Sequence, residues 1–229
     1  MLGTLKKELL TFLVRSEYEA LRLSSAKFRY QPSAVKPLIP CSDRANGTRP
    51  CSDRLEAILR HVPADGKNML DIGSNAGYYL FEFAKRGYAS HGLETDPDLV
   101  HFTALASYVL GIEHVSCELG RLDRPYVQRM KPYDVVLCLS VMHHIIMETS
   151  FENAEAILRG LAANTNKALF FEMGQSNELM ADWSPKLPKM EPDPEQWISA
   201  WLLRCGFRKT EVIGTSTTTV PRLIFVAYP

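Results

Sequence analysis

The sequence predicts an α/β fold built on a mostly parallel, seven-stranded sheet, and three observations lead to this prediction. Short apolar runs alternate along the chain with segments of helical period, as strands and helices do in such folds. The run from Tyr133 to Ser140 is almost continuously apolar, which is typical of a central strand buried on both faces. Residues 207–213 and 223–228 flank a turn rich in threonine and serine, which predicts a C-terminal β-hairpin.

Length limits the number of domains, and charge limits the possible partners. With 229 residues, of which 46% are apolar, the chain can form one sizeable domain. We place this domain at residues 51–229, behind an N-terminal extension formed by residues 1–50. Lysine plus arginine and aspartate plus glutamate both number 26, so bulk charge gives no support for a nucleic-acid partner. Residues 1–60 hold eleven basic and six acidic residues, a surplus of five positive charges, which suits either an anionic substrate or a solvated face.

Cysteine usage and hydropathy favour a cytoplasmic protein. The five cysteines are an odd number and include no Cys-x-x-Cys pair, so neither a disulfide framework nor a zinc site is expected. No apolar run reaches the roughly 20 residues needed to span a bilayer.

The N-terminal extension has two parts. Residues 4–23 carry leucines at near-helical spacing with charged residues between them, which predicts an amphipathic helix. Its apolar stripe must be covered by the domain, by a second subunit of a homodimer, or by a membrane surface in a peripheral contact. Residues 24–50 contain four prolines and predict a loop or lid. Arg44 and Arg49 in this loop, with Arg54 in the helix predicted from residue 52 or 53 to residue 62, are candidate contacts to a charged substrate.

A glycine-containing turn follows the first predicted strand, which is marked by the apolar residues Met69, Leu70 and Ile72. The segment from Asp71 to Gly77 reads Asp-Ile-Gly-Ser-Asn-Ala-Gly and leads into a helix at residues 76–85. Its two glycines allow a ligand to approach the backbone closely, and the helix start presents free N–H groups. The next strand, residues 89–94, ends in Glu94, where a nucleoside-binding α/β fold places a carboxylate for ribose hydroxyls. Asp96 is a competitor for this role, although Asp96-Pro97 also predicts a helix start.

The remaining elements follow in order. Further helices are predicted at residues 99–110, 154–163 and 197–205, and further strands at residues 113–119 and 168–173. The segment 174–194, which contains four prolines, predicts a long connection of the kind that often forms a substrate wall.

Spaced as Asp-x-Gly-x-x-x-Gly, the turn resembles the first motif of class I S-adenosylmethionine (SAM) methyltransferases, whose glycine turn lies beside the methionine half of SAM. It differs from the dinucleotide fingerprint Gly-x-Gly-x-x-Gly, which a nicotinamide-dependent oxidoreductase would carry. The resemblance extends over about residues 51–229 and implies a single Rossmann-like domain with SAM as its cofactor. In this family the loop after the third strand borders the adenine, so Arg121 and Asp123 are candidates there, with a plain loop salt bridge as the alternative. The predicted cofactor-binding residues are Asp71, Gly73, Ser74, Asn75, Gly77, Glu94, Arg121, Asp123 and Ser140.

A narrower resemblance concerns the acceptor side. The run Leu137-Cys138-Leu139-Ser140-Val141-Met142-His143-His144-Ile145, followed by Phe170-Phe171-Glu172-Met173, is similar to the methyltransferase domain of the kinase-methyltransferase that caps O-antigen chains. The acceptor of that enzyme is a terminal sugar phosphate. Ser74 departs from the cysteine found there and in many other members. A similar first motif occurs in enzymes that modify the tRNA wobble uridine.

Two histidines and one glutamate are the predicted catalytic residues. His143 and His144 lie just beyond the fourth strand, where open α/β sheets bind ligands, and one of them would act as general base or position the acceptor. The alternative for either is helix capping or local packing. Glu172 would orient an imidazole or bind the acceptor, and its alternative is an ion pair with Arg222 or another arginine. These three residues could also bind a metal ion, but no additional metal ligands occur at a suitable spacing, so no metal is predicted.

The predicted function is methyl transfer from SAM to an oxygen of a small or glycan-linked acceptor, a sugar or a phosphate. Tyr78, Arg44, Arg49 and Arg54 are the candidate substrate-binding residues. The alternatives are an enzyme of the tRNA wobble-uridine type, and a SAM-binding subunit without catalytic activity.

Overall fold

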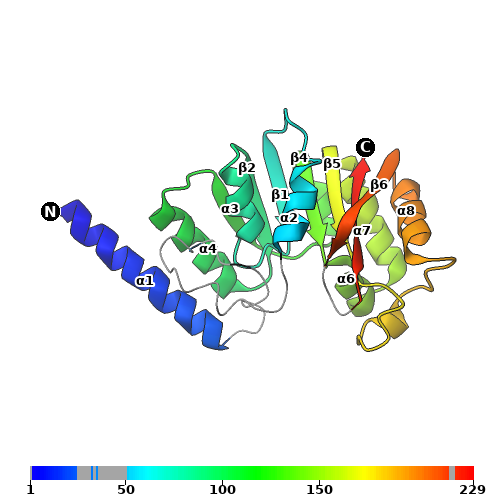
Figure 1. Ribbon diagram of the computed structural model, residues 1–229, viewed down its shortest axis with the longest axis horizontal. Helices are drawn as coiled ribbons and strands as arrows, with labels where there is room; N and C mark the ends of the chain where they lie inside the picture. Colours follow the sequence, from blue (N-terminus) through cyan, green and yellow to red (C-terminus); the bar gives the residue numbers. More distant parts are fainter. Residues whose placement is uncertain (1, 25–31, 33–34, 36–50, 217–219) are drawn as a thin grey trace. The chain divides into compact units, whose positions relative to one another are not determined.

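A seven-stranded sheet organises the part of the chain that the computed structural model describes, residues 2–24, 32, 35, 51–216 and 220–229 (Figure 1). The strand order is β3-β2-β1-β4-β5-β7-β6. The predicted α/β fold is thereby confirmed, including its C-terminal hairpin. The strands are β1 (Asn68–Ile72), β2 (Ala89–Glu94), β3 (Val115–Leu119), β4 (Tyr133–Leu139), β5 (Thr165–Glu172), β6 (Lys209–Ser216) and β7 (Arg222–Tyr228).

Strand pairing brings the carboxyl ends of three strands to one edge. β4 runs parallel to both β1 and β5, while β7 runs antiparallel to β5 and β6. In the register, Ile72 pairs with Cys138, and Leu139 pairs with Glu172. Residues that follow β1, β4 and β5 therefore leave the sheet at the same edge, which is where ligands bind in open α/β sheets.

The helices begin with the capping residues that the sequence supplies. The side chains of Asp96, Ser150 and Asp193 accept backbone N–H bonds at the starts of α4, α7 and α8, which satisfies donors that helices leave open. Helices α5 and α6 follow β3 and β4 and were not predicted. The helices are α1 (Leu2–Ser24), α2 (Ser52–Leu59), α3 (Tyr78–Ala84), α4 (Pro97–Leu110), α5 (Arg124–Arg129), α6 (Met142–Glu148), α7 (Phe151–Ala163) and α8 (Pro194–Arg204), with a 3-10 turn at Ser184–Lys186.

The chain divides into two compact units, and the first contains Met1–Cys51 and Gly73–Gly120. Here α1 lies along α4 (Figure 1). Val14, Tyr18 and Leu21 of α1 are buried in one apolar cluster with residues of α4 that include Leu99 and Phe102. One face of the predicted amphipathic helix is thus covered within this unit. Its other face exposes Leu9, Phe12, Leu13 and Leu23, for which a second subunit or a membrane surface remains a prediction.

The second unit contains Ser52–Ile72 and Arg121–Pro229. Its core is formed by β4, which is buried from Val135 to Leu139, together with β5, β7 and the inner faces of α7 and α8. This burial explains why the sequence of β4 is apolar at successive positions rather than at alternate ones.

No helix in the described ranges is both long enough and apolar enough to cross a membrane. The predicted lid, residues 24–50, lies outside the described residues except at positions 24, 32 and 35. The predicted division of the chain at residue 50 stays a prediction.

Candidate functional site

The turn after β1 has a backbone that favours glycine at two positions. Gly73 and Gly77 have φ angles of 69° and 80°, and Asn75 between them has φ 52°, all in the left-handed region. A Cβ atom on Gly77 would lie 3.0 Å from the Phe81 ring and 3.1 Å from the Thr103 methyl group. The N–H of Gly73 donates to the Leu93 carbonyl at 2.8 Å, so the turn is tied to the end of β2.

Glu94 is held against the same turn. One carboxylate oxygen, Oε2, accepts the Asn75 N–H at 2.8 Å. The other, Oε1, accepts the N–H groups of Thr95 and Asp96 at 2.7 and 3.1 Å and the Thr95 hydroxyl at 3.2 Å. A carboxylate has about four lone-pair positions, so this arrangement leaves Oε2 able to accept a second hydrogen bond. The side chain of Asp96, by contrast, caps α4 by accepting the Asp98 N–H, which is the helix-start alternative predicted for it.

Three other predicted residues near the turn have defined environments. Asp71 is 2% exposed at the end of β1, and its charge adds to burial in raising the pKa of the Cys138 thiol well above its usual range. The Ser74 side chain is fully buried and its hydroxyl lies 3.4 Å from Cys117 Sγ. Tyr78 begins α3, half-buried, with its ring edge-on to Tyr79. Whether they contact a cofactor stays a prediction.

Arg121 and Asp123 have local partners in the loop after β3. Arg121 forms an ion pair with Glu148 at the end of α6. Asp123 caps α5 by accepting the Tyr126 N–H at 2.7 Å. The loop salt bridge stated as the alternative for Arg121 is therefore present. That Arg121 or Asp123 contacts an adenine stays a prediction.

The two histidines lie in α6, directly after β4. His143 is 1% exposed, and its Nδ1 accepts the Gly174 N–H at 3.0 Å. Its ring centroid is 4.2 Å from that of His144 and 4.7 Å from that of Trp183. His144 is exposed, so the pair consists of one buried and one accessible imidazole.

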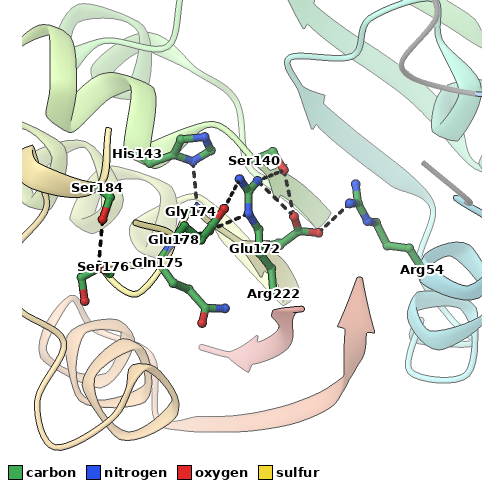
Figure 2. A network of polar contacts seen from close by, with 10 residues as sticks. All are labelled: Arg54, Ser140, His143, Glu172, Gly174, Gln175, Ser176, Glu178, Ser184 and Arg222. Atoms are coloured by element: carbon green, nitrogen blue, oxygen red, sulfur yellow. Dashed lines mark hydrogen bonds and ion pairs between the residues drawn. The ribbon is translucent and has the colours of Figure 1, made fainter. Parts of the chain in front are cut away.

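A network of buried charges surrounds the carboxyl ends of β4 and β5 (Figure 2). Arg222 donates to both carboxylate oxygens of Glu178 at 2.8 Å, through Nε and one terminal nitrogen. Its other terminal nitrogen lies 3.2 Å from the Ser140 hydroxyl and 3.8 Å from Glu172. Two arginines, Arg54 and Arg222, thus balance two glutamates, as buried charges require.

Glu172 is fully buried, and its contacts explain its position. Its carboxylate forms an ion pair with Arg54 at 2.9 Å and accepts the Ser140 hydroxyl at 2.8 Å. The ion pair with Arg222 or another arginine, stated as the alternative for Glu172, is therefore present. Ser140 itself has φ 62°, an uncommon value for a residue other than glycine, which the two side-chain bonds help to hold.

The predicted substrate-binding arginines differ in what can be said of them. Arg54 is 2% exposed and pairs with Glu172. Arg44 and Arg49 lie outside the described residues. No group of three or more histidine, cysteine, aspartate or glutamate side chains suited to a metal ion occurs in the described ranges.

Sequence reasoning missed three residues that take part in the contacts of this site. Gly174, Glu178 and Trp183 all belong to the connection after β5. The sequence marked this segment only as a long connection that contains prolines. A glutamate in an otherwise polar loop gives no signal of burial, because its partner Arg222 lies 44 residues away.

Solved structures share this arrangement of strands and helices. The bifunctional kinase-methyltransferase WbdD superposes with a TM-score of 0.76, at 18% identity, over 92% of this chain and 45% of its own. This chain has the class I methyltransferase fold. The N-terminal domain of EvdMO1, solved with SAH bound, shares the fold with a TM-score of 0.58 at 19% identity, over 79% of this chain and 82% of that domain.

No protein-family model matches the chain, but curated proteins of similar sequence include a carboxymethyltransferase and an O-methyltransferase. The tRNA U34 carboxymethyltransferase of Colwellia psychrerythraea is 26% identical over 179 residues, covering 72% of this chain and 52% of that protein. The ubiquinone biosynthesis O-methyltransferase of Xylella fastidiosa is 24% identical over 171 residues, covering 70% and 69%. The chain spans about half the length of WbdD and of the tRNA-modifying relative. The resemblance to class I methyltransferases predicted from the first motif is confirmed.

Proposed function

We propose that this chain transfers a methyl group from SAM to an oxygen of a small or glycan-linked acceptor, a sugar or a phosphate. The observation that carries the proposal is the contact between Glu94 and the glycine turn. Glu94 Oε2 accepts the Asn75 N–H at 2.8 Å and keeps room for a second donor, which a ribose hydroxyl supplies.

The cofactor is SAM, held by the turn from Asp71 to Gly77 and by Glu94. The left-handed glycines let a ligand lie against the backbone without a Cβ in its way. Ser74, Arg121, Asp123 and Ser140 complete the proposed cofactor contacts. When bound, SAM supplies a methyl group on a positively charged sulfur.

Two histidines of the second unit are proposed to act on the acceptor. Methyl transfer is an in-line displacement, so the chain's main task is to hold the acceptor oxygen in line with the methyl group. His143 and His144 lie beyond β4, at the edge where ligands bind, and provide hydrogen bonds and a base. Glu172 positions this edge through its bonds to Ser140 and Arg54.

An acceptor that carries negative charge fits the surplus of basic residues in residues 1–60. Arg44 and Arg49 are the proposed contacts, with Tyr78 as added surface. Arg54 contributes through Glu172, because its charge is buried and balanced there.

The experiment is transfer of radiolabelled methyl groups from SAM to fractionated acceptors. The proposal is supported if label is incorporated into sugars or sugar phosphates and turnover depends little on the salt concentration. Neutralising Arg44 and Arg49 together should raise KM for the acceptor about tenfold or more. The matched control neutralises the exposed Lys131 and Arg208, which precede β4 and β6, and should leave KM unchanged. An unchanged KM in both double variants removes Arg44 and Arg49 from acceptor binding.

A second candidate is methylation of tRNA, favoured by the similarity to the tRNA U34 carboxymethyltransferase. A protein that neutralises several phosphates binds less tightly as salt rises, with a slope that reports their number. Labelling of total tRNA with a steep salt slope would therefore replace the proposed acceptor with tRNA and leave methyl transfer from SAM intact.

A further inference from the structure

His143 and His144 are consecutive residues with different chemistry available to them. The His143 ring is buried, and its Nδ1 receives a hydrogen bond from the Gly174 N–H at 3.0 Å. The His144 ring is exposed on the same helix.

The hydrogen bond from Gly174 determines the tautomer of His143. A backbone N–H can only donate, so Nδ1 must carry a lone pair. A neutral imidazole has one N–H, which is then on Nε2. His143 therefore carries its proton at Nε2 and has no lone pair there to accept a second one. Protonation at Nδ1 would break the bond to Gly174 and leave a charge on a ring that is 1% exposed.

The position of Gly174 is itself fixed by its neighbours. A Cβ atom on Gly174 would lie 2.5 Å from Trp183 Nε1 and 3.0 Å from His143 Cγ, so the backbone passes closely between the two rings. The Arg222 guanidinium lies 5.2 Å from the Trp183 ring centroid. Arg222 also binds Glu178, which accepts the Gln175 N–H at 2.6 Å. These contacts hold the donor against His143, and Figure 2 draws the residues involved other than Trp183.

A neutral His143 matters for its neighbour. The two imidazole centroids are 4.2 Å apart, and two imidazolium ions at that separation would repel each other. Because His143 stays neutral, His144 can take up a proton without a second positive charge on the adjacent ring.

We propose that the two histidines divide the reaction, with His143 as a neutral Nε2–H donor to the acceptor and His144 as the base. This inference rests on the proposed function and specifies a hydroxyl as the acceptor group. The acceptor oxygen forms the new bond to the methyl carbon with its own electron pair, and the carbon–sulfur bond breaks with its pair left on sulfur. The hydroxyl proton passes to His144, which returns it to solvent.

Charged groups lie on the elements around α6. Glu178 and Arg222 pair with each other, and Glu172 pairs with Arg54. Glu148 on α6 pairs with Arg121. The connection after β5 also carries Asp182, Lys186 and Lys189, and α7 carries Glu152 and Glu155, the latter bound to Arg159 and Arg204.

The tautomer can be measured without any acceptor. Long-range ¹H–¹⁵N NMR on the protein with ¹⁵N-labelled histidine distinguishes the two neutral tautomers from imidazolium, and His143→Gln and His144→Gln assign the signals. His143 should remain a single neutral species with its proton on Nε2 from about pH 5.5 to pH 8.5, the range in which histidines in proteins ordinarily titrate. A His143 that protonates in this range overturns the proposal.

Kinetics test the division of roles. Glutamine retains an N–H donor near the position of His143 Nε2, so His143→Gln should keep kcat within about tenfold, whereas His143→Leu should lose about 100-fold. Both should retain the acid limb of the pH profile of kcat/KM. His144→Gln should lose that limb and about 100-fold in kcat. SAM affinity, measured by calorimetry, should be unchanged in all three.

Two results would contradict the proposal. An acid limb that disappears in His143→Gln and persists in His144→Gln would exchange the roles. A wild-type profile with no acid limb would remove the base, as expected for an acceptor that is already an anion. Absence of any methyl transfer would instead refute the proposed function, while the NMR result on His143 would still decide its tautomer.

Gly174→Ala provides an independent test of the hydrogen bond. The added methyl group must displace Trp183 or His143, so the neutral Nε2–H signal of His143 should shift or split. Gly214→Ala is the matched control, because its Cβ would meet Ala57 at an ordinary 3.4 Å. An unaltered His143 signal in Gly174→Ala would show that Gly174 does not determine the tautomer.

Discussion

The guanidinium of Arg222 and the carboxylate of Glu178 form a bidentate ion pair, with both N···O distances at 2.8 Å. The pair joins the first residue of β7 to the connection after β5, and both side chains are less than 10% exposed. Parallel N–H···O bonds of this kind fix orientation as well as separation. The pair therefore determines where Trp183 and Gly174 lie relative to β5.

Loss of one member of this pair should destabilise the protein strongly. Glu178→Ala leaves Arg222 buried without its main counterion, and we expect the free energy of unfolding to fall by about 3–5 kcal/mol. Urea denaturation measures this change. Glu56→Ala, which removes an exposed partner of Arg60 at 3.6 Å, should cost less than about 0.5 kcal/mol. Similar losses in the two variants would show that the buried pair contributes little.

SAM affinity should depend on Glu94 and not on Asp96. Glu94→Ala removes the acceptor for a ribose hydroxyl and should weaken binding by about 1–3 kcal/mol in calorimetry. Asp96→Asn keeps a side chain that caps α4 equally well and should bind SAM as the wild type does. If Asp96→Asn loses affinity and Glu94→Ala does not, the ribose lies on Asp96.

Alanine substitutions at Gly77 and Gly111 distinguish the cost of a steric clash from the cost of a left-handed backbone. Both have positive φ angles, 80° and 66°, but a Cβ on Gly77 meets Phe81 and Thr103, whereas one on Gly111 meets nothing within 4 Å. Gly111→Ala should cost only the left-handed backbone penalty of about 1–2 kcal/mol. Gly77→Ala should cost more in thermal unfolding and should also weaken SAM binding. Equal losses of stability would mean that Phe81 and Thr103 adjust freely.

Alkaline pH should destabilise the protein partly through Cys205. Burial, followed by the Glu155 charge, raises the pKa of Cys205 from 9.0 to about 11. Below pH 9 the thiol is neutral in both the folded and the unfolded chain. Between about pH 9 and 11 the unfolded chain ionises first, so stability falls as pH rises. Cys205→Ala should make that fall less steep in urea titrations, and an identical slope in both proteins would contradict the prediction.

The methyltransferase fold and its cofactor turn could be predicted from sequence because they depend on local patterns. The glycines at 73 and 77, the acidic residue at the end of β2 and the continuous apolar run of β4 each report backbone conformation or burial directly. The bounds of β2 agree with the predicted residues 89–94. Helix α6 was missed, since its seven residues follow a buried strand without a capping residue to mark a boundary.

Only the tertiary structure decided how the acceptor side is arranged. Glu172 forms ion pairs with Arg54 and Arg222 because the register of β4 and β5 places its carboxylate at the sheet edge beside α2 and β7. The tautomer of His143 depends on a backbone N–H that lies 31 residues further along the chain. Sequence alone determines which groups can carry charge or donate a hydrogen bond, whereas burial decides which of them must be paired, because an unpaired charge in the interior is costly.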